Sequence, residues 1–376
     1  MEVIEMRKQR IVVKIGSSSL TNDKGEIDQQ KLNDHIHALA ALREANHEVI
    51  LVSSGAVAAG FRRLGYSSRP VTLKGKQAAA AVGQSLLIQT YMEKFSVYGI
   101  TAAQLLLTRD DFSNRERYRN AYATMTELLE RGILPIINEN DTVSIEELTF
   151  GDNDMLSALV SGFIHADQLI ILTDINGIYS GNPRTNSSAV KYDFLDEIPN
   201  EMIEAAGTSG SKVGTGGMKS KLMAAKTATM IGVPVFIGHG NGHDKLLQVL
   251  QGSGDGTYIA GHAKEHINTR KQWIAIHSES MGKLYVDKGA EEAISHHGSS
   301  LLSAGVLRIS GTFEKGDVVQ VYGIHELLGK GEICCSSVEL QKAIEDHMEN
   351  ERITPSIEAI HRDGWVSVQK IGEELS

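Results

Sequence analysis

Two lysine-bearing segments, far apart in the chain, have the glycine-rich, hydroxyl-rich composition expected of a polyphosphate-binding site. Residues 211–221 read SKVGTGGMKSK and match neither a Walker loop nor a dinucleotide fingerprint. Lys14 lies inside the apolar run IVVKI and precedes Gly16-Ser17-Ser18-Ser19, whose backbone N–H groups suit an anion. A buried lysine needs an anionic partner, although an edge-strand lysine could instead extend its ammonium to water. Lys14 and Lys221 together indicate phosphoryl transfer, which depends on positioning and positive charge.

The sequence offers no evident catalytic base to accompany these lysines. It shows no nucleophilic cysteine, serine triad or histidine cluster. A hydroxyl acceptor often requires a base, whereas a carboxylate, with a free pKa of about 4.3, is already ionised. The residues therefore favour a carboxylate as the phosphoryl acceptor.

A third cluster is acidic and rich in amides, in the stretches NEND (138–141) and GDND (151–154). Three interpretations stay open: a pair of Asx turns, a magnesium site, or a site that recognises a substrate ammonium. In the last case the amides and Ser54 would face the substrate carboxylate. Asp154 could also be a counter-charge that holds the two lysines.

The elements that must position these residues alternate between strand and helix. Apolar runs predict buried parallel strands over 11–15, 49–52, 105–107, 134–137, 169–172 and 233–237. Helices are expected from Asp28 to Ala45, over 78–95 and over 116–130. The predicted fold class is α/β, a three-layer arrangement of a mostly parallel sheet flanked by helices. Polar small residues follow four of the strands, where ligands gather in such sheets.

A second, smaller domain is expected in the last third of the chain. Short β-like runs with glycine turns cover 273–276, 282–286, 306–309, 317–321 and 365–368. We predict a first domain over 1–260, a linker over 261–272 and a β-rich domain with a C-terminal tail over 273–376. Residues 271–376 hold ten basic and seventeen acidic side chains, so nucleic acid is a poor electrostatic partner.

Composition and length place the chain among globular proteins. It has 376 residues, of which 41% are hydrophobic and 22% are charged, with a net charge of −10. No apolar run approaches the roughly 20 residues of a membrane helix, and the amino terminus lacks a signal-peptide core. These features predict a cytoplasmic protein without a membrane partner. The two cysteines, Cys334 and Cys335, are adjacent and suggest neither a disulfide framework nor a zinc site.

Several stretches, in order and at matching spacing, resemble the glutamate 5-kinases of the amino acid kinase superfamily. They are VVKIGSSSLT, VSSGAVAAG, KQAAAAVGQSLLIQTY, LLLTRDDFSNRERYRNA, PIINENDTV, GDNDMLSALV, LTDINGIY and GTGGMKSKLMAA. The segments GSSLLSAGV and HRDGWVSV resemble the PUA domain that many members carry. The likeness covers nearly the whole chain.

The resemblance implies ATP-dependent phosphorylation of the γ-carboxylate of L-glutamate, the first step of proline biosynthesis, with Mg²⁺ and with no assigned protein ligand to the metal. Catalytic roles fall on Lys14, Lys221 and, through the superfamily's organising aspartate, Asp154. Substrate-binding roles fall on Ser54, Asn138, Asp141, Asp152 and Asn153. Nucleotide contacts fall on Lys14, Gly16, Ser17, Thr173, Asp174, Thr215, Gly216, Gly217, Met218, Lys219, Ser220 and Lys221.

The resemblance also implies partners: feedback inhibition by L-proline, a homo-oligomer (dimer or tetramer) and glutamyl phosphate reductase. The acidic cluster suits a free α-ammonium and argues against N-acetylglutamate. Two rivals remain at this point. One is another superfamily phosphotransferase, an aspartate or uridylate kinase, and the other is RNA binding through the PUA-like domain. A dinucleotide-binding dehydrogenase is poorly supported because no Gly-x-Gly-x-x-Gly opens a helix after a strand.

Overall fold

The computed structural model describes residues 7–143, 153–183, 185–206, 217–240, 242–261, 271, 273–278, 280–349 and 356–367. The chain divides into two compact units. The first comprises Met1–Asp111 and Glu116–Lys264, and the second comprises Phe112–Arg115 and Glu265–Ser376. Each unit has its own sheet and its own apolar core. No described helix is both long enough and apolar enough to cross a membrane.

The first unit is built on an eight-stranded sheet with the order β3-β4-β2-β1-β5-β9-β10-β8. The six strands from β3 to β9 in this order are parallel, and β10 runs antiparallel to β9. Its strands are β1 (Arg10–Ile15), β2 (Glu48–Ser53), β3 (Ala102–Leu107), β4 (Leu134–Glu139), β5 (Gln168–Leu172), β8 (Phe194–Leu195), β9 (Val235–Gly238) and β10 (Gly256–Ile259). A separate hairpin pairs β6 (Ile178–Tyr179) with β7 (Lys191–Tyr192).

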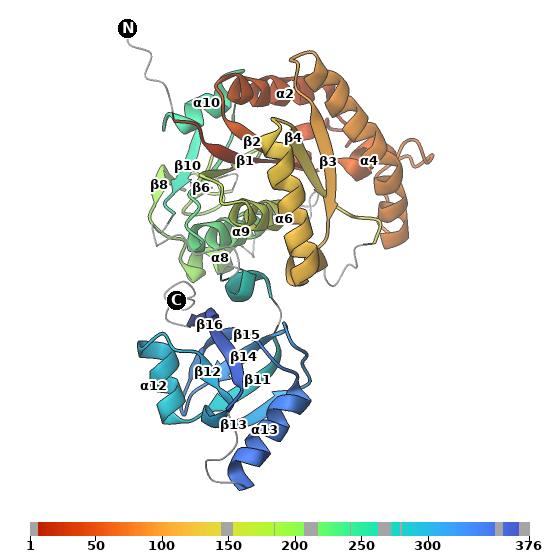
Figure 1. Ribbon diagram of the computed structural model, residues 1–376. Helices are drawn as coiled ribbons and strands as arrows, with labels where there is room; N and C mark the ends of the chain where they lie inside the picture. The colour runs from red at the N-terminus through yellow and green to blue at the C-terminus, as the bar shows by residue number, and fades with distance from the viewer. Residues whose placement is uncertain are drawn as a thin grey trace. The chain divides into compact units, whose positions relative to one another are not determined.

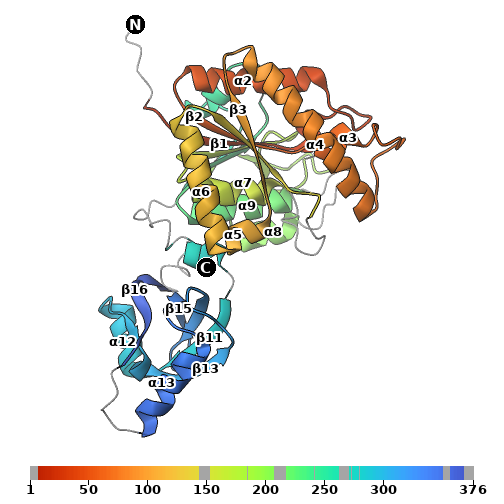
Figure 2. The same cartoon turned by 45° about the vertical axis from the view of Figure 1, so that its right-hand side comes forward.

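Helices cover both faces of this sheet, which confirms the predicted three-layer α/β fold (Figures 1 and 2). The longer helices are α2 (Gln29–Glu44), α4 (Leu73–Ser96), α6 (Arg115–Glu130), α7 (Asn153–Phe163) and α9 (Met218–Met230). Shorter ones are α1 (Ser17–Leu20), α3 (Ala56–Gly60), α5 (Arg109–Ser113), α8 (Asn200–Ala206) and α10 (Lys245–Leu250). The predicted cap of α2 is present, because Asp28 accepts hydrogen bonds from the N–H groups of Gln30 and Lys31.

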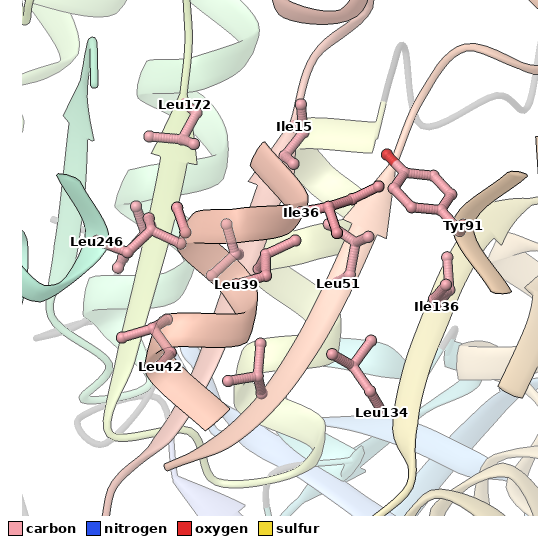
Figure 3. Packing of buried hydrophobic residues seen from close by; sticks show 14 of the residues in the cluster. Ile15, Ile36, Leu39, Leu42, Leu51, Tyr91, Leu134, Ile136, Leu172 and Leu246 are labelled. Atoms are coloured by element: carbon pink, nitrogen blue, oxygen red, sulfur yellow. The ribbon is translucent and has the colours of Figure 1, made fainter. Parts of the chain in front are cut away.

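The core of the first unit lies between the sheet and the apolar side of α2. Ile36, Leu39 and Leu42 project from α2 onto Leu51 and Leu172 of the sheet (Figure 3). The four strands whose ends carry polar residues, β4, β2, β1 and β5, are neighbours in the sheet. Because they are parallel, their carboxyl ends meet at one edge.

The second unit holds a six-stranded sheet of order β12-β16-β15-β14-β11-β13, in which only β11 and β14 pair in parallel among the described residues. The strands are β11 (Ser280–Val286), β12 (Leu301–Leu302), β13 (Val306–Gly311), β14 (Val318–Tyr322), β15 (Leu327–Ile333) and β16 (Glu358–Ser367). Helices α12 (Lys288–His296) and α13 (Ser337–Glu349) and the short η2 (Ser303–Gly305) complete it. The predicted β-rich domain is therefore present.

One predicted strand is wrong. Residues 273–276 form part of a π-helical turn, η1 (Trp273–His277). The N–H of Ser278 donates to the carbonyl of Trp273 at 2.9 Å, and the Trp273 indole donates to the carbonyl of Phe112 at 3.0 Å. An apolar run of four residues has no periodicity that separates a buried strand from a buried helical turn, so the tertiary contacts decide.

Candidate active site

Lys14 lies on β1, a central strand, so the alternative of an edge-strand lysine is excluded. Its side chain bends toward the carboxyl end of the strand, where Gly16 precedes the short α1. A Cβ on Gly16 would lie 3.3 Å from the Lys14 ammonium nitrogen, so glycine leaves room for the lysine beside the backbone. Only 2% of Lys14 is exposed.

Asp154 brings the two predicted lysines together. It lies in the first turn of α7 and is fully buried. One of its carboxylate oxygens, Oδ1, accepts from the Lys14 ammonium, and Oδ2 accepts from the Lys221 ammonium at 2.9 Å. The Ser220 hydroxyl also donates to Oδ2, at 3.0 Å. This geometry supports the predicted counter-charge role, in which a single carboxylate organises both lysines.

The lysine pair and its carboxylate contain two cations and one anion. Lys221 is 7% exposed and lies in α9, whose first residues follow Gly217. Buried ammonium groups attract anions, because burial removes the water that would otherwise solvate their charge. The arrangement is therefore suited to receive a phosphoryl group between the lysines.

A second cluster joins β2, β4 and α7 through amides and hydroxyls. The Asn153 amide nitrogen donates to Ser54 Oγ and to Asn138 Oδ1, both at 2.9 Å. Behind it, Ser53 Oγ and Tyr91 Oη lie 2.8 Å apart in the core. Three of the predicted substrate-binding residues, Ser54, Asn138 and Asn153, are thus in direct contact.

Asp141 follows β4 and adds negative charge to this edge of the sheet. Burial, together with the neighbouring Glu139 carboxylate, raises the pKa of Asp141 to about 6. Clustered carboxylates of this kind bind a cation well.

Thr173 and Asp174 lie on the other side of β1, after β5. The Thr173 hydroxyl donates to the Asp174 carboxylate at 3.2 Å, and the His239 ring lies 3.2 Å from the Thr173 carbonyl oxygen. A cavity of about 430 Å³ opens here, lined by Asp174, Ile175, Asn176, Tyr179, Pro183, His239 and Asp255. Of these lining residues only Asp174 is a predicted nucleotide contact, and His239 and Asp255 come from a segment with no phosphate-binding pattern.

Some of the remaining predicted residues lie within the described ranges and others lie outside them. Gly217 precedes α9, Met218 and Ser220 are half-buried, and Lys219 is exposed. Ser17 begins α1 beside Gly16. Asp152, Thr215 and Gly216 lie outside the described residues. Within the described ranges, no group of three or more histidine, cysteine or acidic side chains could hold a metal ion.

Comparison with known proteins agrees with the family resemblance seen in the sequence, over nearly the whole chain. The sequence model of the amino acid kinase family matches residues 9–239, and that of the PUA domain matches residues 282–352. The chain is 63% identical over 372 residues to a glutamate 5-kinase of Oceanobacillus iheyensis, which covers 98% of this chain and all of that protein. It is 62% identical to glutamate 5-kinase 1 of Bacillus licheniformis and 59% identical to glutamate 5-kinase 1 of Bacillus subtilis, covering 97% of this chain and all of each relative.

Proposed function

The chain belongs to the amino acid kinase family and, within it, to the glutamate 5-kinases, and from that premise we propose how its residues phosphorylate L-glutamate with ATP. The product, L-glutamyl 5-phosphate, is the first intermediate of proline biosynthesis. The observation that carries the mechanism is the pairing of Lys14 and Lys221 with the two oxygens of Asp154.

The reaction is a transfer of the γ-phosphoryl group between two oxygens. An oxygen of the substrate γ-carboxylate forms a bond to the γ-phosphorus, and the bond from that phosphorus to the β–γ bridging oxygen breaks, releasing ADP. The acceptor is already ionised near neutral pH, so no proton has to be removed. The protein supplies position and positive charge, which is most of what phosphoryl transfer requires.

The lysines act on the group that moves. Lys14 approaches from β1 and Lys221 from α9, so their ammonium groups can contact the transferring phosphoryl from two sides. Asp154 fixes both side chains before substrate binds, which avoids ordering them during the reaction. Thr173, Asp174 and the residues from Gly217 onward then take the nucleotide, with the cavity beside Asp174 open to its remaining parts.

The amino acid is held at the neighbouring strand ends. Ser54, Asn138 and Asn153 form the hydrogen-bonding surface, and Asp141 supplies the charge for the α-ammonium. Asp152 belongs to the same proposed group on sequence grounds. N-Acetylglutamate lacks the ammonium and is not expected to be a substrate.

Use of ATP follows from membership of a kinase family, and we assign the divalent ion as Mg²⁺. Mg²⁺ keeps waters and phosphate oxygens as ligands in nucleotide sites, so a dedicated protein cage is not required. It neutralises phosphate charge when bound. L-Proline as an inhibitor, a dimer or tetramer, and a partnership with glutamyl phosphate reductase are further proposals, as is the partition at residues 261–272.

An ATP-dependent hydroxamate assay tests the substrate assignment. We expect γ-glutamyl hydroxamate from L-glutamate, and little product from L-aspartate or N-acetylglutamate. A preference for aspartate, or formation of UDP from UMP, would replace the assignment. The alternatives of an aspartate or uridylate kinase and of an RNA-binding protein are not favoured, because the relatives described above are glutamate 5-kinases over the whole chain.

A further inference from the structure

Helix α4 reaches the amide cluster through Gln84, a residue that the mechanism above does not use. The Asn138 amide nitrogen donates to Gln84 Oε1 at 2.8 Å. Gln84 is half-buried and lies 54 positions before Asn138 in the chain. Among the described residues it has no hydrogen bond to Asn153 or Ser54, and its recorded link to the amide cluster is through Asn138.

The orientation of the Asn138 amide is fixed by the backbone. The N–H of Glu139 donates to Asn138 Oδ1 at 2.9 Å. A backbone N–H can only donate, so the atom it meets must be the amide oxygen. The amide nitrogen of Asn138 then faces Gln84, and Gln84 must present its oxygen.

This polarity continues to Asn153 and Ser54. Asn153 uses both amide hydrogens, one on Asn138 Oδ1 and one on Ser54 Oγ. Its own Oδ1 is buried and has no hydrogen-bond partner among the described residues. Ser54 Oγ accepts from Asn153, which leaves the Ser54 hydroxyl hydrogen free to donate. This series of hydrogen-bonded side chains thus ends in two neighbouring groups. One is an acceptor without a described partner, Asn153 Oδ1, and the other is a donor, the Ser54 hydroxyl.

An acceptor beside a donor is the complement of an α-amino acid, whose ammonium donates and whose carboxylate accepts. We propose that Gln84 is a positioning residue that, together with the Glu139 N–H, holds the polarity of the hydrogen-bonded series Asn138–Asn153–Ser54 and so favours a substrate with a free α-ammonium. This inference rests on the proposed function and names how that site distinguishes an amino acid from a plain dicarboxylate.

Loss of the Gln84 acceptor leaves the Asn138 amide nitrogen without a partner. An unsatisfied buried donor costs about 1–3 kcal/mol, so the Asn138 side chain is held less firmly against the Glu139 N–H and the Asn153 amide. The orientation of Asn153 is then less firmly fixed by the Asn138 oxygen. Its amide can turn and direct hydrogens at the substrate ammonium, where two donors oppose each other.

The test compares L-glutamate with glutarate, which has both carboxylates and no ammonium. In the full-length protein, Gln84→Met keeps the length of the side chain and removes its acceptor. We expect the KM for glutamate to rise about tenfold, the loss of roughly one hydrogen bond to a charged group. The inhibition constant of glutarate, the KM for ATP and kcat should stay within about twofold of wild type.

Two further variants separate positioning from a general structural effect. Gln89→Met makes the same change on the same helix, where Gln89 hydrogen-bonds only the exposed Glu93 among described residues, and should leave all constants unchanged. Gln84→Glu keeps an oxygen that accepts from Asn138, so the ratio of glutarate inhibition constant to glutamate KM should stay at or above the wild-type value. If Gln84→Met does not fold, Gln84→Leu, which also lacks the acceptor, takes its place in the comparison.

The inference is overturned if Gln84→Met weakens glutamate and glutarate by the same factor, or if neither changes. It is also overturned if Gln84→Glu loses the discrimination. The wild-type reaction tests the proposed function independently, because an enzyme that phosphorylates glutamate can still show no dependence of discrimination on Gln84.

Discussion

Lys14 and Lys221 meet opposite oxygens of one carboxylate, although they come from the first strand of the sheet and from a helix near the end of the first unit. The carboxylate is that of Asp154, which is fully buried. The proposed phosphate-binding group is therefore a unit of three side chains, Lys14, Asp154 and Lys221, in which each lysine is held by the shared carboxylate. This explains why no single loop in the sequence carries a complete phosphate-binding pattern.

Replacement of Lys221 by alanine should lower kcat by about 10²–10³, the usual effect of removing one group that stabilises charge in the transition state. The KM for glutamate should change little, because the Lys221 ammonium contacts Asp154 and not the amide cluster. Steady-state kinetics with both substrates measure this. Lys226→Ala, which removes a lysine of the same helix that bonds Asn200, is the control. Turnover near wild type in Lys221→Ala would show that the role is misassigned.

Asp154→Asn keeps the shape of the side chain and removes its charge. Two buried ammonium groups then share a site without their common anion, and breaking such a buried pair costs about 3–5 kcal/mol. We expect a lower free energy of unfolding and a kcat reduced at least as much as in Lys221→Ala. In the double variant that combines Asp154→Asn with Lys221→Ala, the loss of transition-state stabilisation should be far from the sum of the two single losses. The reason is that the residues act as one unit. Additive losses would mean that the three side chains work independently.

Much of the site could be predicted because the ends of buried strands can be recognised in the sequence. Apolar runs gave the strands, and parallel order placed Lys14, Ser54, Asn138 and Thr173 at one edge. The sequence predicts Asp154 as a counter-charge for the lysines, both as one interpretation of the acidic cluster and through the resemblance to the superfamily. Its residue type allowed it, but only the packing of α7 against β1 and α9 decided it.

The residues near the site that the sequence did not predict lie on helix α4 and in the segment that holds β10. Gln84 sits among alanines and small residues of α4, and nothing in its neighbours distinguishes it from a solvent-facing glutamine. His239 and Asp255 lie in a stretch, 238–261, that reads as a domain edge because it is rich in glycine and polar residues. Helix α10 and strand β10 form there, and β10 extends the sheet as the antiparallel partner of β9.

Gly83→Ala tests the close crossing of α3 and α4 beside the substrate site. A Cβ on Gly83 would lie 1.8 Å from the carbonyl oxygen of Ala56, and a Cβ on Gly60 would meet α4 in the same way. The helices would have to separate, so we expect a loss of about 1–3 kcal/mol in the free energy of unfolding, by analogy with an overpacked core. Chemical denaturation measures it, with Ser85→Ala on the exposed side of α4 as control. Unchanged stability in Gly83→Ala would contradict the close approach.

Substrate affinity should depend on pH through Asp141. Its pKa is raised to about 6 by burial and by Glu139, so it loses its charge as the pH falls through that value. The KM for glutamate should then rise by up to about tenfold per pH unit below 6, because the ammonium loses its counter-ion. Asp141→Asn should have a high KM that varies little between about pH 5.5 and 7.5.

The raised pKa of Asp141 also affects folding stability, and its pH dependence is opposite to that of glutamate affinity: low pH favours the fold, whereas higher pH favours binding. A carboxyl whose folded pKa lies above its ordinary value of 3.8 stabilises the fold fully below that value, and the contribution is lost as the pH rises through about 6. At pH 8 the ligand-free Asp141→Asn protein should therefore have a higher Tm than wild type, while binding glutamate less well. A lower Tm together with an unchanged KM would show that Asp141 holds the fold and not the substrate.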